Sequence, residues 1–128
     1  MIAETVKLAF NNEFQGYMET GNGKVEIAKK AMHPYNLLFG ALGSCLYATF
    51  LDIVYKKRLT FDGVDMEVSG SHKDTPPTTL EKVFIKFIIK NPSNQAQFQR
   101  SIELAAKYCT IHETISRVAT INTEVEFK

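Results

Sequence analysis

The sequence predicts an α+β fold whose elements follow the order βββ-α-ββ-α-α-β. Polar and apolar side chains alternate near both ends of the chain, as they do in strands. Apolar side chains recur every three or four positions from 34 to 57 and from 98 to 109, as they do in helices. The 128 residues contain no internal repeat or linker-like stretch. We therefore expect one domain over residues 1–128.

The N-terminal third is predicted to form three strands. Residues 5–10 alternate polar and apolar side chains, and the paired asparagines at 11–12 mark a turn before a second strand at 14–19. Residues 21–23, Gly-Asn-Gly, accept the positive φ angles of a tight hairpin. A third strand at 24–28 pairs back on the second, which completes a meander.

A long helix is predicted from Pro34 to about Lys57. Proline suits a first helical turn because its missing N–H would be unpaired there. Gly40 and Gly43 predict close approach of another helix. The helix is apolar on more than one face, so we expect it to be buried. Spacings of four, three, four and four place these residues on one face: Leu38, Leu42, Cys45, Thr49 and Ile53.

The second half is predicted to contain two strands, two helices and a last strand. Residues 64–69 alternate, and 83–89 are almost continuously apolar, which is typical of a central strand. A proline-containing loop at 73–79 separates them. Residues 122–127 alternate again and form the last strand.

Two shorter helices are expected between these strands. The first follows a stop signal at 91–93 and carries its apolar face on Phe98, Ile102, Ala105 and Cys109. Thr110 and Glu113 have the spacing of a capping box, which predicts a short second helix ending near Val118. Cys109 would then lie at the junction of the two helices.

Composition argues against several classes of function. A net charge of +1 offers no electrostatic footprint for nucleic acid or for an anionic membrane. The longest apolar run is interrupted by glycine and polar residues and ends at Asp52, so we expect no membrane span. No signal peptide is evident, which predicts a cytoplasmic protein with reduced cysteines. The chain has no CxxC, HxxxH or phosphate-binding glycine motif, so we expect no metal and no cofactor.

Cys45 and Cys109 are the candidate reactive groups. Both fall on apolar helix faces, and Gly43 and Ser44 remove bulk beside Cys45, so the two sulfurs can meet across a helix pair. A helix that starts beside Cys109 would stabilise a thiolate. The alternative is that both are small core residues, since free cysteine is commonly buried.

The histidines are weaker candidates. His112 lies three positions after Cys109, and His33 shortly precedes the long helix, so a Cys/His nucleophilic pair is possible in principle. A capping or helix-start role is the favoured alternative for both histidines. Aromatic side chains on the long helix are expected to pack in the core, or alternatively to line the mouth of a hydrophobic site.

Two segments resemble the OsmC/Ohr family. Residues 33–45, HPYNLLFGALGSC, are similar to its pattern of a proline that begins the helix bearing a first cysteine. Lys107-Tyr108-Cys109 resembles the second site, and the branch with Tyr-Cys-Thr/Ser at that site is the most similar. The spacing of the two cysteines and the order of strands and helices are similar to those of the family along essentially the whole chain.

The resemblance implies an OsmC-like fold and a chemistry. The fold would be an intertwined homodimer with central long helices and wrapping antiparallel sheets, and the site would lie at the subunit interface. Cys45 would be the peroxidatic thiolate and Cys109 the resolving thiol. The substrates would be organic hydroperoxides, and an external thiol would reduce the resulting disulfide.

The chain departs from the hydroperoxide-reducing members at two points. They carry a glutamate after the helix-starting proline, where this chain has Tyr35 and Asn36. They also carry an arginine in the N-terminal strands, whereas the arginines here are Arg58, Arg100 and Arg117.

Either a different group stabilises the thiolate or the chemistry is slow or different, because a cysteine pKa is ordinarily near 8.5 and burial raises it. We expect that group to be a helix N-terminus or one of the side chains of His33, His112, Lys29 and Lys30. Tyr35 could donate a hydrogen bond to the peroxide.

The leading hypothesis is thus a thiol-dependent peroxidase that forms a Cys45 sulfenic acid and then a Cys45–Cys109 disulfide. One alternative is a non-catalytic protein that holds a small apolar ligand. Another is a redox sensor whose disulfide changes a partner contact.

Overall fold

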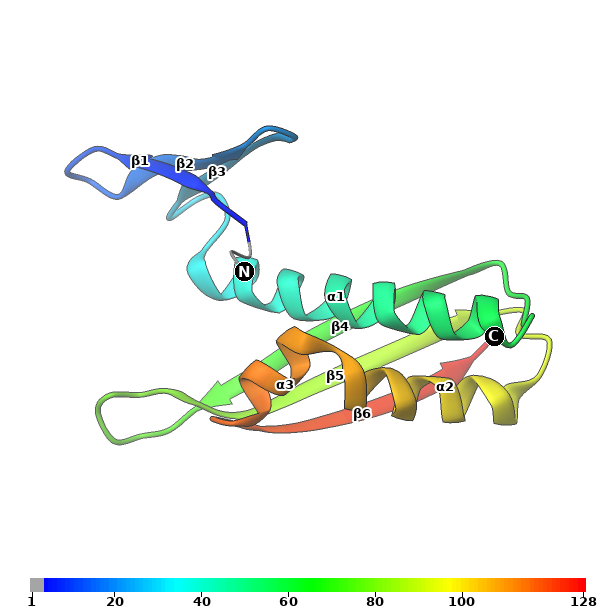
Figure 1. Cartoon of the computed structure of the whole chain (residues 1–128). Helices are drawn as coiled ribbons and strands as arrows, with labels where there is room; N and C mark the ends of the chain where they lie inside the picture. Colours follow the sequence, from blue (N-terminus) through cyan, green and yellow to red (C-terminus); the bar gives the residue numbers. More distant parts are fainter. Residues whose placement is uncertain (1–3) are drawn as a thin grey trace. The chain divides into compact units, whose positions relative to one another are not determined.

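The computed structural model describes residues 4–128 and contains two compact units, Met1–Leu38 and Phe39–Lys128. Its nine elements follow the predicted order of strands and helices (Figure 1). The predicted α+β class is therefore confirmed. The expectation of a single domain over residues 1–128 stays a prediction.

The first unit holds an antiparallel sheet with the order β1-β2-β3, formed by Lys7–Phe10, Gln15–Thr20 and Gly23–Ala28 (Figure 1). The predicted meander is confirmed, with ends that shift by one or two residues. Leu8 pairs with Met18 and Met18 with Val25, so apolar side chains share one face. Leu8 and Phe10 are 54% and 46% exposed on that face.

The second unit holds the sheet β4-β5-β6 and three helical segments. β4 and β5 pair antiparallel, but β5 and β6 pair in parallel, which differs from the expectation of purely antiparallel sheets. The reason is that two helices carry the chain back to the starting edge of β5, and such a crossover joins parallel strands. The bounds are Pro34–Lys56 for α1, Gly63–His72 for β4, Leu80–Lys90 for β5, Gln95–Tyr108 for α2, Thr110–Ser116 for α3 and Thr120–Phe127 for β6.

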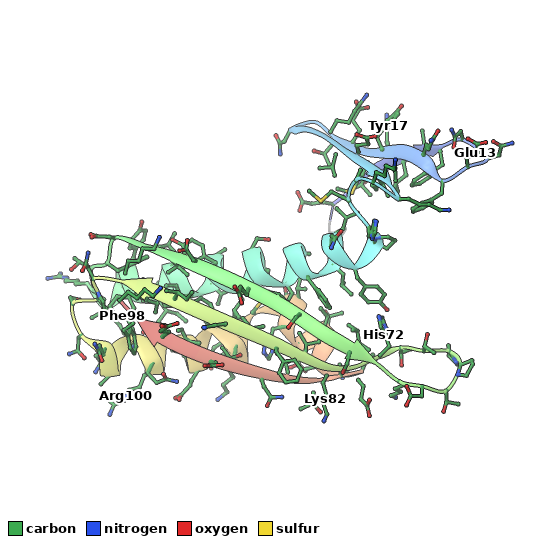
Figure 2. All side chains as sticks on the ribbon, turned by 180° about the vertical axis from the view of Figure 1, so that it is seen from behind. Glu13, Tyr17, His72, Lys82, Phe98 and Arg100 are labelled. Carbon is green, nitrogen blue, oxygen red and sulfur yellow. The ribbon has the colours of Figure 1, made fainter. Side chains whose placement is uncertain are left out.

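All three helices cover one face of this sheet, as the front and back views agree (Figures 1 and 2). β5 is the central strand, as predicted. Its inward side chains, Val83, Ile85, Phe87 and Ile89, are buried under the helices. Phe84 points to the opposite face and is 47% exposed.

An aromatic cluster joins the helices to the sheet. The ring of Phe50 on α1 lies 5.9 Å from that of Phe61, 5.6 Å from that of Phe87 and 6.0 Å from that of Phe98. Such separations are typical of tilted and edge-on aromatic pairs in protein cores. This cluster fixes α1 and α2 on the sheet and thereby positions the ends of both helices.

The buried stripe of α1 differs from the predicted one. The structure buries Leu42, Leu46, Phe50 and Val54, which follow a strict four-residue spacing. Cys45, Thr49 and Ile53 are only half-buried, at the margin of the stripe. The expectation that Cys45 lies on a buried apolar face is therefore met only in part, because Cys45 is half-buried at the edge of that face.

The glycines of α1 also differ from expectation. A Cβ atom placed on Gly43 would lie 3.4 Å from Val68 Cγ2 and 3.7 Å from Met66 Cε, both on β4. The close approach at this glycine is therefore to a strand rather than to another helix. A Cβ atom on Gly40 would have no heavy atom of the described residues within 4 Å, apart from its chain neighbours and the helix backbone within four residues of it.

By length and composition α1 is a candidate membrane span, with 23 residues and a mean hydropathy of 1.8 over its best 18-residue window. The expectation that this interrupted run offers no membrane span is therefore not confirmed by length and composition. A core helix of a globular protein passes the same test, and the stripe through Leu42 and Phe50 packs on the sheet.

Candidate active site: a thiol pair at a helix junction

Cys109 occupies the single residue between α2 and α3. Its backbone is extended, with φ −70° and ψ 120°, so it ends one helix and begins the next. Its N–H donates to Ala105 O at 2.8 Å, and its Sγ accepts from the N–H of His112 at 3.5 Å. The predicted position of Cys109 at a helix junction is confirmed.

The predicted capping box is wrong. Cys109, rather than Thr110, is the N-cap residue of α3, because the extended backbone at Cys109 places Thr110 inside the first turn. Glu113 Oε1 instead pairs with Arg117 Nη2 at 3.1 Å, one turn later. The hydroxyl of Thr110 is therefore not used as a cap.

The structure brings Cys45 and Cys109 together. Their Sγ atoms lie 3.3 Å apart, with the Cys109 thiol as donor and the Cys45 sulfur as acceptor. Both cysteines are free, and Cys109 is buried while Cys45 is half-buried. A disulfide bond is about 2.05 Å long, so the sulfurs need to approach by roughly 1.3 Å to bond.

Hydrogen-bond donors from α3 surround the Cys45 sulfur. Thr110 Oγ1 lies 4.0 Å from Cys45 Sγ. Burial is the largest single influence and opposes ionisation, but hydrogen bonds from the Ile111 N–H, Cys109 and Thr110 together outweigh it and lower the pKa of Cys45. Burial therefore acts on this thiol in the expected direction, and the start of α3, a helix N-terminus of the kind expected to stabilise the thiolate, supplies donors that offset it.

The pKa of Cys109 is shifted in the opposite direction. Burial raises the pKa of Cys109, the N–H of His112 opposes that rise, and the neighbouring Cys45 sulfur adds to it. When two adjacent thiols share protons, the one with more donors ionises first. Of the two thiols, Cys45 is therefore the one that loses its proton more readily and Cys109 the one that retains it.

Of the other predicted site residues, His112 contributes through its backbone rather than through its ring. His112 acts through its backbone N–H, while its ring lines a cavity of about 450 Å³ together with Lys73, Glu81 and Arg117. Burial lowers the pKa of the His112 ring, and Glu113 partly opposes this.

His33 and Tyr35 belong to the first unit, whereas both cysteines belong to the second. His33 is used locally: its Nε2 lies 2.8 Å from Lys29 O, and its N–H donates to Asn36 Oδ1 at 2.9 Å. Their support of Cys45 stays a prediction.

Sequence reasoning missed the donors supplied by Thr110 and Ile111. A usable signal was present, because a hydroxyl residue directly follows Cys109 at a predicted helix start. Among residues 4–128, no group of three or more His, Cys, Asp or Glu side chains is arranged to hold a metal ion. The chemistry that this site itself offers is thiol chemistry.

Fold and site together define an α+β protein with a close dithiol pair at a junction of helices. The family described as OsmC-like protein matches residues 27–124, from β3 to β6. The chain belongs to the OsmC-like family.

The similar proteins agree with this assignment. A Mycoplasma pneumoniae protein named hydroperoxide reductase is 25% identical over 121 residues, which cover 91% of this chain and 83% of that protein. A hypothetical protein from Aquifex aeolicus VF5 has a similar crystal structure, with a TM-score of 0.90, 22% identity, and coverage of 100% of this chain and 98% of that chain. An OsmC like protein from Mycoplasma pneumoniae has a TM-score of 0.88 and 20% identity, with 98% and 97% covered.

Proposed function

We propose that the protein is a thiol-dependent peroxidase that reduces organic hydroperoxides. The observation that carries this proposal is the 3.3 Å contact between two free thiols, of which Cys45 has a lowered pKa and Cys109 a raised one. A nucleophilic thiolate beside a protonated resolving thiol is the arrangement that two-cysteine peroxide reduction requires. Membership of the OsmC-like family and the similarity to a protein named hydroperoxide reductase support the substrate class.

In the first step, the Cys45 thiolate attacks the distal oxygen of the hydroperoxide. A sulfur–oxygen bond forms, the oxygen–oxygen bond breaks, and the departing alkoxide takes a proton to leave as an alcohol. Cys45 is oxidised to a sulfenic acid while the peroxide is reduced. Donors from Thr110 and Ile111 hold the attacking sulfur as an anion before this step.

In the second step, Cys109 attacks the oxidised sulfur of Cys45. The disulfide bond forms, the sulfur–oxygen bond breaks, and the proton of the Cys109 thiol leaves with the hydroxyl group as water. Two equivalents of an external thiol then reduce the disulfide and are themselves oxidised to a disulfide. This scheme uses no metal and no organic cofactor.

We further propose that the protein is a cytoplasmic homodimer with no nucleic-acid or membrane partner. The apolar face of β1-β2-β3 leaves Leu8 and Phe10 exposed, and only 28% of the most apolar window of α1 is buried. Exposed apolar area of this kind is typical of a surface that a second chain covers. A dimer would explain why so apolar a helix is incompletely covered by its own chain.

A second function is supported by a cavity of about 330 Å³ beside α1. Tyr47, Leu51 and Tyr55 on α1 line it, together with Leu59 and Phe61. Thr60 and Asp62 add polar groups to this lining, and cavities of about this size accept small ligands. Non-catalytic binding of such a ligand, or redox sensing by the same thiol pair, is therefore the alternative to peroxide turnover.

Steady-state turnover of variants separates these functions. With cumene hydroperoxide and an excess of a dithiol, the wild-type protein should consume peroxide catalytically, and Cys45→Ser should reduce the rate to the uncatalysed background. Cys109→Ser should form the Cys45 sulfenic acid without the intramolecular disulfide. Undiminished turnover by Cys45→Ser would overturn the proposed mechanism.

A further inference from the structure

The hydroxyl of Thr110 is the one side-chain group other than Cys109 that contacts the Cys45 sulfur within hydrogen-bond range among the described residues 4–128. Thr110 is the first residue of α3 and directly follows Cys109. The proposed function counts this hydroxyl among the donors that hold the Cys45 anion, without separating its contribution from that of the Ile111 N–H.

We propose that Thr110 is a specific determinant of catalysis, because its hydroxyl donates a hydrogen bond to the Cys45 thiolate and thereby keeps that sulfur ionised. A thiolate has no proton and can only accept, so in the contact of 4.0 Å the hydroxyl must be the donor. Cys109 donates to the same sulfur at 3.3 Å, which is consistent with Cys45 as the acceptor of both bonds.

The backbone around Thr110 fixes its hydroxyl. Cys109 is held from both sides, by Ala105 O and by the N–H of His112. The carbonyl oxygen of Thr110 accepts from Thr114 Oγ1 at 2.8 Å, which anchors the first turn of α3. A β-branched side chain has few χ1 rotamers, so Thr110 loses little freedom when it makes the contact.

The other groups around Cys45 do not replace this donor. The titratable groups of the helix junction are Lys107, Tyr108, Cys109, His112 and Glu113, and of these only Cys109 is among the groups that shift the pKa of Cys45. The pKa of Cys109 is raised, and burial lowers the pKa of the His112 ring. On the side of β4, the residues next to Gly43 are the apolar Met66 and Val68. The nearest acidic residue of α1, Asp52, is seven positions away and exposed. Neutral donors from the start of α3 therefore take the place of a cation.

The test compares Thr110→Val, which removes the hydroxyl and keeps the shape, with Thr110→Ser, which keeps the hydroxyl. Alkylation of Cys45 by iodoacetamide is followed by peptide mass spectrometry from pH 5 to 10. Thr110→Val should slow Cys45 alkylation at pH 7 by about three- to tenfold and leave the rate at high pH unchanged, because one hydrogen bond to a charged group is lost at an exposed position. Thr110→Ser should retain the wild-type profile.

Ser116→Ala is the matched control, because its hydroxyl donates to the backbone carbonyl of Glu113 at 2.7 Å in the same helix and bonds neither to Thr110 nor to the thiol. If Thr110→Val fails to fold by circular dichroism, Thr110→Ala is measured in its place. An unchanged pH profile in the folded variant would overturn the role of Thr110, as would an equal shift in Ser116→Ala.

The role of Thr110 in catalysis rests on the proposed function, whereas the pH dependence of Cys45 alkylation does not. A shifted profile in a protein that never consumes peroxide would refute the peroxidase and retain the donor role. Peroxide turnover by wild type with an unshifted Thr110→Val profile would refute the donor role and retain the peroxidase.

Discussion

The Sγ atoms of Cys45 and Cys109 lie 3.3 Å apart although 64 positions separate them in the chain. Cys45 is carried by α1, whose Phe50 packs against Phe87 of the sheet. Cys109 is held between α2 and α3, and α2 reaches the same core through Phe98. The contact of the two thiols is thus a consequence of how two helices pack on one sheet.

The two thiols should differ in reactivity. In the reduced protein at pH 7, we expect iodoacetamide to modify Cys45 at least about tenfold faster than Cys109, since the lowered pKa and greater exposure both favour Cys45. Because the pKa of Cys45 is below that of an ordinary thiol, its reactivity should persist as the pH falls below the range in which free cysteine reacts. Peptide mass spectrometry after timed quenching measures both rates, and equal rates would contradict the assignment of the nucleophile.

His112 should make the fold sensitive to acid. Its folded pKa is lowered by burial, so the unfolded chain binds its proton first as the pH falls. Stability should therefore decline from about pH 6.5 downward until the folded pKa is passed. Between pH 7 and pH 5 the Tm of wild type should fall by a few degrees more than that of His112→Gln. His72→Gln, at an exposed histidine of β4, is the control, and an identical decline in all three proteins would contradict the prediction.

The aromatic cluster should dominate the stability of the second unit. Phe50 is fully buried against three other phenylalanine rings. Phe50→Ala should lower the free energy of unfolding by about 3–5 kcal/mol in urea titrations. Phe84→Ala, on the open face of β5, should change it by only about 0.5 kcal/mol. Similar losses for the two variants would mean that Phe84 is covered in the assembled protein.

The proposed homodimer should depend on the apolar face of the first sheet. Phe10 and Ala9 are neighbours on β1 whose side chains point to opposite faces. Phe10→Lys places a charge on the apolar face and should weaken dimerisation, whereas Ala9→Lys should not. Sedimentation velocity over a range of concentrations measures both, and a monomeric wild-type protein would refute the dimer.

The order of the elements was predictable because each has a clear local signal. The hairpin at Gly21-Asn22-Gly23, the proline start of α1 and the continuous apolar run of β5 each reflect backbone chemistry or burial on a single element. The parallel pairing of β5 with β6 was not predicted, because it depends on where two intervening helices return the chain rather than on either strand.

The two site cysteines were identifiable, but their environment was not. The residues of α1 that pack on the sheet recur every four positions, which places Cys45 at the margin of the buried stripe. The helix is rotated only slightly from the predicted orientation, and the periodicity of the sequence does not reveal so small a rotation. The cap at Cys109 shifts α3 by one residue and frees the Thr110 hydroxyl for the thiol. Such one-residue shifts are set by tertiary contacts and decide which groups act as donors.

The most direct test is to mix the fully reduced protein with one equivalent of cumene hydroperoxide, quench within seconds and map both cysteines by intact and peptide mass. The proposed chemistry predicts rapid formation of a Cys45–Cys109 disulfide within the chain, with one equivalent of alcohol released. Two free thiols after several minutes would contradict it.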